Sequence, residues 1–363
     1  MQPDVPQKRK RRRPVARKSN QPVCSPARRV GRVLYRIVVV LAAIIVILFC
    51  AYKIISRPPT MAPDPTPEPP EVTTPIAGET PAPVVSTTPA PQRREGVYTF
   101  LLAASDQVGA NADTIMVCTY DTVNQKVGLV SIPRDTLVEA GKINSLYHKG
   151  VDTLKATVSD MLGIPIDHYV TVSIRGFVKV IDAVDGIDFN VPVHMSYDDP
   201  TQDLHIHFEA GMQHLTGTEA LLVARCRKNS DGPGEYPNNV YDAYPDADIG
   251  RTRTQQQLIT TVVKKVLSRP DKLTQVVSTL MDHVNTDLSL SNVLWLLEPA
   301  LGLDFSADIS TATLEGDGNT YYPGWGHYCY QLYPEQALEV VNTMLNPYDR
   351  DLTLDDMNIF QYQ

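Results

Sequence analysis

In this 363-residue chain, an apolar run near the N-terminus limits the possible folds more than any other feature. If it spans a membrane, the residues before it and after it lie on opposite sides of that membrane. Residues 37–52 carry no charge, and with their apolar neighbours the run at 33–56 can cross about 30 Å of hydrocarbon as one helix. The preceding residues, 1–36, contain twelve Lys and Arg and one acid. Since basic flanks stay in the cytoplasm, we predict a single-pass cell-membrane protein with a cytoplasmic tail at 1–32 and an extracellular C-terminal domain.

Two other interpretations of the N-terminal region fit less well. A cleaved signal peptide would have a shorter apolar core followed by small residues, and the bulky Leu48-Phe49 pair does not suit a lipoprotein signal at Cys50. The basic run at 8–13 could bind nucleic acid. Beside a membrane span, however, topology and anionic lipid explain it more simply. We therefore expect no nucleic-acid partner.

A change in composition after the apolar run marks a linker and a folded domain. Residues 57–95 are rich in Pro and Thr and lack apolar periodicity, which predicts an extended extracellular linker. The rest is a suitable length for one α/β domain, in which we separate a catalytic part at 96–270 from a C-terminal part at 271–363. The cysteine spacing there excludes a disulfide framework, and at most one bridge can form.

Positive charge is scarce in the folded part and is concentrated in one stretch. From residue 96 onward, 17 Lys and Arg face 35 Asp and Glu, and four of the eight arginines lie between 225 and 253. Arginine suits phosphate because its planar guanidinium forms bidentate hydrogen bonds and stays charged. Ion pairs on a solvated surface would give the same counts. Charge alone thus leaves both an anion site and a surface network open.

Alternating and continuous apolar runs predict an α/β fold. Strands are expected at 96–103, 114–120, 126–132, 168–173 and 187–193, and helices at 151–162 and 177–184. The short turn between the second and third strands makes them an antiparallel hairpin. The strand ends then meet at one edge of the sheet, where they gather Asp106, Asp113, Arg134 and Asp135. Two carboxylates beside an arginine can hold a divalent cation next to a phosphate.

Helical phase separates the arginines of the second basic run. In a helix over 251–267, steps of 100° per residue place Arg251 and Gln255 on the apolar stripe and Arg253 on the opposite side. An arginine on a buried stripe needs an anionic partner, whereas a solvated one does not. A helix N-terminus also attracts anions. The phase favours an anion site that contains Arg251 and Gln255, with Arg253 on the surface.

The first basic run follows a predicted short helix. Thr216 and Glu219 have the spacing of a capping box, which predicts a helix that ends near Arg225. If the chain is extended from there, Arg225 and Arg227 point to the same side, because alternate residues of a strand share a face. Both then belong to one site.

One pair of histidines could bind a metal ion. His205 and His207 lie on the same face of a predicted strand. A hairpin that exposes two histidines explains them more simply, and we interpret them in that way.

With these residues located, the sequence resembles the LytR-CpsA-Psr family of cell-wall glycopolymer transferases. Ordered blocks between about 98 and 267 carry the resemblance, among them LLAASD, NADTIMV, VGLVSIPRDT, FVKVIDAVDGIDFNVP, GMQHLTGTEALLVARCR and DIGRTRTQQQ. The resemblance implies an α/β fold with a mixed central β-sheet flanked by helices (α/β/α), preceded by a single transmembrane helix. It also implies a membrane-anchored phosphotransferase that moves a glycopolymer, such as teichoic acid or capsule, from a polyprenyl-pyrophosphate carrier to a peptidoglycan sugar hydroxyl through a phosphodiester link.

The resemblance assigns roles to residues by position. The pyrophosphate is expected to bind Arg134, Arg225, Arg227, Arg251 and Gln255. The catalytic set adds two carboxylates, Asp113 and Asp248, either of which could accept the hydroxyl proton. The expected metal ligands are Asp106 and Asp113, with Mg²⁺ or Mn²⁺ as the cofactor.

The sequence departs from the family pattern at three places. Ala104 replaces a usual glycine, Asn111 replaces a usual arginine, and residues 228–247 separate the two basic runs by more than is common. The last two departures bear on substrate preference more than on reaction type. Three alternatives stay open: a polyprenyl-pyrophosphate hydrolase, a non-catalytic protein of the cell envelope that binds the lipid pyrophosphate, and a transcriptional regulator that acts through the basic tail. The regulator fits least well, because the tail lacks a fold and the domain is expected across a membrane.

Overall fold

The structure is a computed structural model, and it describes residues 50, 52–64, 91–105, 111–199, 203–229, 241–245, 248–269, 271–324 and 326–362. The chain divides into Met1–Ile55 and Ser56–Gln363. No helix within the described ranges has the length and hydropathy needed to span a membrane. Most of the transmembrane helix predicted at 33–56, and all of the tail at 1–32, lie outside the described residues.

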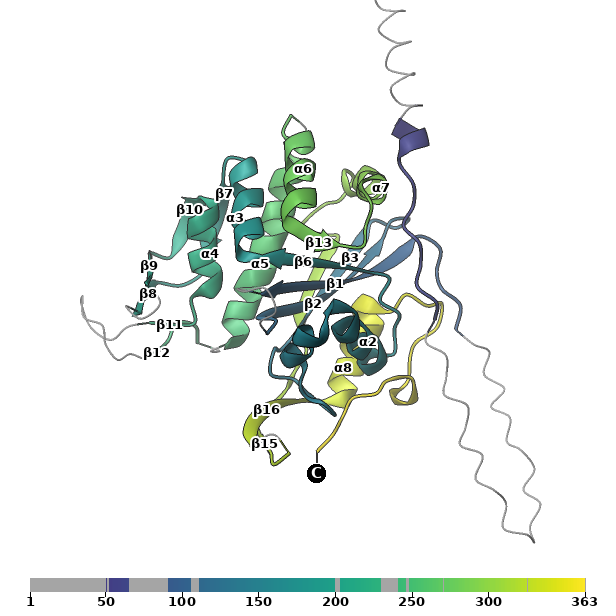
Figure 1. Cartoon of the computed structure of the whole chain (residues 1–363), viewed down its shortest axis with the longest axis vertical. Helices are drawn as coiled ribbons and strands as arrows, with labels where there is room; N and C mark the ends of the chain where they lie inside the picture. The colour runs from purple at the N-terminus through teal and green to yellow at the C-terminus, as the bar shows by residue number, and fades with distance from the viewer. Residues whose placement is uncertain are drawn as a thin grey trace, which may run out of the picture. The chain divides into compact units, whose positions relative to one another are not determined.

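A six-stranded mixed sheet forms the centre of Ser56–Gln363 (Figure 1). Its strands are β1 (Val97–Ser105), β2 (Thr114–Asp121), β3 (Lys126–Ile132), β6 (His168–Ser173), β13 (Val284–Thr286) and β14 (Ile309–Thr313). They are ordered β13-β6-β1-β2-β3-β14. The β1–β2, β2–β3 and β13–β6 pairs are antiparallel, and the β1–β6 and β3–β14 pairs are parallel. The mixed central sheet and the predicted β2–β3 hairpin are confirmed.

The pairing register explains why several strand ends share one edge. Ala104 of β1 pairs with Thr114 at the start of β2, and Ser105 pairs with Ser173 at the end of β6. The end of β3 reaches the same edge, because Ile132 pairs with Ile115. The edge predicted from the hairpin therefore exists, and the loops that leave it hold the polar residues of the site described below.

The helices pack on both faces of the sheet (Figure 1). They are η1 (Ile143–Lys149), α2 (Val151–Leu162), α3 (Ile174–Ala183), α4 (Gly217–Arg225), α5 (Asp248–Leu267), α6 (Leu273–His283), α7 (Leu290–Ala300), α8 (Pro334–Val340), η2 (Val341–Leu345) and η3 (Leu354–Asp356). The predicted helix at 151–162 is confirmed, and it ends at Gly163 in a left-handed conformation. The helix predicted at 177–184 begins earlier, because Ser173 caps it by accepting a hydrogen bond from the backbone N–H of Gly176.

Five two-stranded ribbons complete the part of the fold that the structure describes. They are β4 (Leu137–Val138) with β5 (Gly141–Lys142), β7 (Ile187–Val191) with β10 (Gly211–Leu215), β8 (Met195–Asp199) with β9 (Leu204–Phe208), β11 (Lys228–Asn229) with β12 (Tyr241–Asp242), and β15 (Gly316–Tyr322) with β16 (His327–Leu332). The β11–β12 pair joins the two ends of the insertion noted at 228–247. The strand predicted at 187–193 ends at Val191.

The main hydrophobic core covers one face of the sheet. Leu101, Ile115 and Val130 of the sheet are fully buried against α2 and η2, which contribute Leu154 and Leu345 among others. A smaller cluster on the opposite face packs Tyr98 and Phe100 against α7. A third cluster lies among α3, α4, α5 and the β7–β10 and β8–β9 ribbons. A cavity lies next to the third cluster, and Leu102, Met116 and Val170 of the sheet are part of its wall.

The two ends of the predicted folded part share the sheet. Edge strands β13 and β14 come from the C-terminal part, 271–363, and flank strands of the part at 96–270. The linker also touches the domain: the backbone N–H of Arg57 bonds the carbonyl of Ser291, and the N–H of Ala62 donates to Asp167 at 2.7 Å. Residues 57–64 are therefore held on the domain surface, while residues 65–90 lie outside the described part.

A close approach of β3 to η2 gives a test of the packing. A Cβ atom built at Gly128 would lie 2.0 Å from the carbonyl oxygen of Met344, which is backbone and cannot rotate away. We expect Gly128→Ala to lower the free energy of unfolding by about 3 kcal/mol, the upper range for overpacking a core. Chemical unfolding of the purified chain measures this. Gly318→Ala is the control, since its Cβ would meet only ordinary contacts, and equal midpoints for both variants would contradict the packing.

Candidate active site

A cavity of about 740 Å³ lies between the sheet and the helices α3 to α6. Its walls come from β1, β2 and β6 on the sheet side and from α3, α4, α5 and α6 on the other, with Tyr197 and Leu204 of the β8–β9 ribbon closing one side. Six residues predicted for the site line it: Asp113, Arg134, Arg225, Arg227, Arg251 and Gln255. Residues far apart in the sequence thus meet around one volume.

The sheet edge contributes an ion pair to the cavity. The guanidinium of Arg134 donates to the carboxylate of Asp113 at 2.7 Å, and both side chains are partly exposed, at 37% and 44%. Asp135 turns to Lys142, whose ammonium donates to it at 3.1 Å. Asp113 directly precedes β2, and its backbone N–H bonds the carbonyl of Ala104. The edge therefore presents a carboxylate and a guanidinium, both accessible from the cavity.

The end of α4 contributes two more arginines. Thr216 and Glu219 form the predicted capping box, and the helix runs to Arg225, which is its last residue rather than the start of an extended segment. Arg225 and Arg227 are both exposed and both line the cavity. Cys226 between them is buried, and burial raises the pKa of its thiol to about 12. The thiol stays protonated, so Cys226 packs in the core and is not a nucleophile.

The first turns of α5 contribute Arg251 and Gln255. The amide of Gln255 accepts a hydrogen bond from the hydroxyl of Thr114 at 3.2 Å and donates to the carbonyl of Ala224 at 3.1 Å. These two bonds tie α5 to the start of β2 and to the end of α4. Arg251 lies one turn earlier on the same side of the helix and is half-buried in the cavity wall. Gln255 therefore fixes the position of the helix that presents Arg251.

The predicted helical phase is confirmed. Arg251 and Gln255 line the cavity together with Leu258 and Val262, whereas Arg253 is exposed and borders a different surface hollow beside β14 and α8. Two other predicted residues have no described side chain. Asp106 lies outside the described residues, and Asp248 is the first residue of α5 with a side chain that is not described.

Away from the arginines the cavity is aliphatic. Its wall there is made by side chains from six elements, β1, β2, β6, α3, α5 and α6: Leu102, Met116, Val170, Val172, Phe177, Val180, Ile259, Val262, Val263 and Leu280. Along α5 the lining changes from Arg251 to Gln255, Ile259 and Val263, a path of about 18 Å at 1.5 Å per residue. The cavity therefore has a cationic end and a long apolar end.

Some lining residues escape prediction from the sequence. Lys228 follows Arg227 directly and adds a cation, so counting lysine with arginine in the first basic run would have found it. Thr114 holds Gln255, but no local pattern links residues 141 positions apart. Tyr197 and Leu204 belong to a ribbon whose place beside the cavity is set by tertiary packing alone.

Comparisons with known proteins agree with this fold and site. The LytR_cpsA_psr family model matches residues 71–346. The chain is 34% identical over 229 residues to the polyisoprenyl-teichoic acid–peptidoglycan teichoic acid transferase TagV of Bacillus subtilis (strain 168), which covers 58% of this chain and 55% of that protein. It is 35% identical over 204 residues to TagU, the transferase of the same description from Bacillus anthracis, covering 53% of this chain and 60% of that protein. The chain thus spans somewhat over half the length of these relatives.

The fold agrees with a solved structure as well. The crystal structure of B. subtilis TagV superposes with a TM-score of 0.57 at 27% identity, covering 69% of this chain and 96% of that chain. The shared fold is a mixed α/β domain around a central mixed sheet. Because the family model matches well over half of its residues, this chain belongs to the LytR_cpsA_psr family.

Proposed function

We propose that this chain is a phosphotransferase that moves a glycopolymer from a polyprenyl-pyrophosphate carrier to a sugar hydroxyl of peptidoglycan. One observation carries the proposal: the cavity joins a cationic end, with Arg134, Arg225, Arg227 and Arg251, to a long aliphatic wall. A polyprenyl pyrophosphate has the same division, with an anionic head and an apolar chain. The names of the relatives TagV and TagU support teichoic acid as the glycopolymer.

The chemistry needs charge neutralisation more than covalent help. The sugar hydroxyl oxygen attacks the phosphorus that carries the glycopolymer, a new P–O bond forms, and the bond to the bridging oxygen breaks as polyprenyl phosphate leaves. Negative charge grows on the bridging and outer oxygens. Guanidinium groups placed around the pyrophosphate stabilise this charge. In phosphoryl transfer, positioning and charge stabilisation supply most of the rate enhancement.

The hydroxyl proton has two candidate acceptors. Asp113 lies on the cavity wall, and Asp248 begins the helix that carries Arg251. Arg134 donates to Asp113 at 2.7 Å, so that pair separates or shifts when a pyrophosphate competes for the guanidinium. The carboxylate of Asp113 is then released toward the reacting groups.

A divalent cation fits the same end of the cavity. Asp113 offers a partly exposed carboxylate beside the site for the pyrophosphate, and Mg²⁺ and Mn²⁺ prefer such oxygen ligands together with phosphate oxygens. We propose Asp113, together with Asp106, as the ligands. The bound ion supplies further neutralisation of the pyrophosphate charge.

The location of the protein is part of the proposal. The apolar run at 33–56 and the basic residues before it support an N-terminal transmembrane anchor with the catalytic domain outside the cell membrane. Both proposed substrates, a lipid-linked polymer and peptidoglycan, are found there. Protease accessibility of the domain on intact cells would test this topology.

The deciding experiment combines the purified full-length chain with a lipid-linked glycopolymer, Mg²⁺ and a peptidoglycan acceptor. We expect polymer joined to peptidoglycan by a phosphodiester, together with one polyprenyl phosphate per transfer. Release of polyprenyl phosphate at the same rate without acceptor would identify a hydrolase instead. Tight binding of the lipid without turnover would identify a binding protein.

Metal removal should reduce transfer strongly. We expect a chelator to lower the rate at least about tenfold, because the charge of the pyrophosphate is then left to the arginines alone. Added Mg²⁺ or Mn²⁺ should restore it. Asp113→Asn should require more metal for half-maximal rate than the unaltered chain. Unchanged turnover in the chelator would contradict the assigned metal role.

A further inference from the structure

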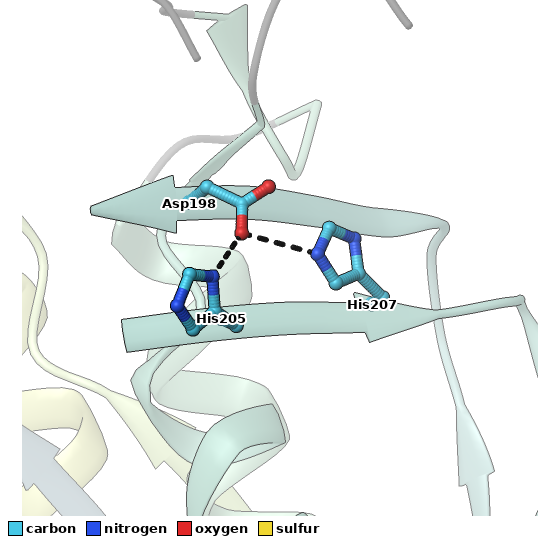
Figure 2. Close-up of side chains that lie close together, drawn as sticks. All are labelled: Asp198, His205 and His207. Atoms are coloured by element: carbon cyan, nitrogen blue, oxygen red, sulfur yellow. Dashed lines mark hydrogen bonds and ion pairs between the residues drawn. The ribbon is translucent and has the colours of Figure 1, made fainter. Parts of the chain in front are cut away.

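A cluster of three polar side chains lies on the β8–β9 hairpin, among residues to which the proposed reaction gives no role (Figure 2). Asp198 of β8 lies between the rings of His205 and His207 of β9. One oxygen of Asp198 is 2.5 Å from Nδ1 of His205 and 3.2 Å from Nε2 of His207. The three ligand atoms lie within 4.8 Å of one another.

The strand register explains why these side chains converge. Asp198 pairs directly with His205, and Ser196 pairs with His207, so His207 is the diagonal neighbour of Asp198 on the same face. The alternate residues Tyr197 and Ile206 turn to the other face and pack in the third hydrophobic cluster. A slip of one residue would bury both histidines. The hydrophobic pattern therefore holds the cluster in place.

The donor set identifies a class of metal ion. We propose that Asp198, His205 and His207 bind a divalent transition-metal ion of the Zn²⁺ type, with its fourth position open to solvent. Two imidazole nitrogens and one carboxylate oxygen are common zinc ligands, whereas Mg²⁺ and Ca²⁺ prefer oxygen alone. Among the described residues, no other group of three His, Cys, Asp or Glu side chains brings its ligand atoms this close.

The distances require only small adjustments. Ligand atoms around a tetrahedral Zn²⁺ lie about 3.3 Å apart, given metal–ligand bonds near 2.0–2.1 Å. The separation of Asp198 from His207, 3.2 Å, already suits this geometry, and that of Asp198 from His205, 2.5 Å, has to open. The histidine side chains are 50% and 57% exposed, so their rings can turn. Asp198 is only 7% exposed and supplies the fixed ligand.

Other histidines in the chain show what an ordinary pair looks like. His214 bonds a single carboxylate, Asp188, at 2.8 Å, and His194 bonds Glu209 at 3.1 Å. All four of these side chains are more than half exposed. In the hairpin, by contrast, two imidazoles converge on one oxygen of a carboxylate whose side chain is only 7% exposed. That convergence is what a metal ion needs and what an isolated surface pair lacks.

The cluster lies on the ribbon that closes one side of the cavity, so a bound ion would stabilise that wall. Tyr197 and Leu204, on the opposite face of the same ribbon, line the cavity. Each is the sequence neighbour of a proposed ligand, Asp198 or His205. An ion that joins β8 to β9 at this point stabilises the outer side of that cavity wall. The ion is distinct from the proposed Mg²⁺, since it is bound by nitrogen ligands on another element.

The test measures zinc binding by the full-length chain purified without a polyhistidine tag. Titration calorimetry is expected to show one Zn²⁺ per chain, with binding retained in excess Mg²⁺. His205→Ala and His207→Ala are each expected to weaken it at least about tenfold, a loss that removal of even an outer-shell partner can reach. Both side chains are exposed, so these variants keep the core. His214→Ala is the matched control and should bind as the unaltered chain does.

A second measurement locates the effect in the structure. Zn²⁺ is expected to slow amide hydrogen exchange in β8 and β9 of the unaltered chain and of His214→Ala, but not of His205→Ala. Absence of zinc binding, or equal losses in His205→Ala and His214→Ala, would overturn the site. Neither result bears on glycopolymer transfer, which is assayed separately with Mg²⁺.

Discussion

Arg251→Ala is expected to lower the rate of glycopolymer transfer by about a thousandfold, the lower end of what one arginine contributes at a phosphoryl group. Arg251 is half-buried in the cavity wall at the start of α5, where the helix N-terminus also favours an anion. The substitution removes a positive charge that stabilises the transition state, in which the bridging oxygen becomes negative. Arg225→Ala should have a similar effect. Transfer is measured with a lipid-linked glycopolymer and a peptidoglycan acceptor.

The chain offers a matched control on the same helix. Arg253 is two residues further on, exposed, and directed away from the cavity. The transfer rate of Arg253→Ala should stay within about twofold of that of the unaltered chain, because exposed charges on a protein surface contribute little free energy. The unfolding temperature of both variants is measured alongside transfer, so that a loss of transfer can be separated from a loss of the fold. Full transfer by Arg251→Ala, or equal losses in the two variants, would refute the assignment of the arginines.

The parts of the site that the sequence predicts are those that follow from local periodicity. Apolar runs on either side of a short turn predicted β2 and β3, and hence the edge that holds Asp113 and Arg134. The helical period separated Arg251 from Arg253 without any knowledge of the fold. Both inferences use only neighbours in the chain. The capping box likewise predicted a helix that ends near Arg225, and α4 ends at that residue.

Other parts depend on contacts between distant residues and could not be predicted. Strands β13 and β14 join the sheet from positions more than 100 residues away, and neither has a strong strand pattern of its own. The hydrogen bond between Thr114 and Gln255 has the same origin. The histidines at 205 and 207 show the limit most clearly. Their shared face is readable from the sequence, but the position of Asp198 opposite them is known only from the register of the hairpin.

Ile259→Trp is expected to separate binding of the lipid chain from binding of its pyrophosphate. Ile259 lies one turn beyond Gln255 on the same side of α5 and lines the aliphatic part of the cavity. A tryptophan there fills space that the polyprenyl chain needs, and the cost of displacing it grows with the length of chain that has to pass. We expect transfer from a full-length polyprenyl donor to fall at least about tenfold, equivalent to 1.4 kcal/mol of lost binding.

A short donor and a surface variant make this result specific. A donor with one or two isoprene units does not reach beyond the new side chain, so Ile259→Trp should use it almost as well as the unaltered chain does. Gln257→Trp places the same residue on the exposed side of α5 and should affect neither donor. Equal losses with long and short donors would mean that tryptophan disturbs Gln255 and the arginines instead. Because the arginine variants should fail with both donors, the two sets of substitutions together distinguish the cationic end of the cavity from its apolar end.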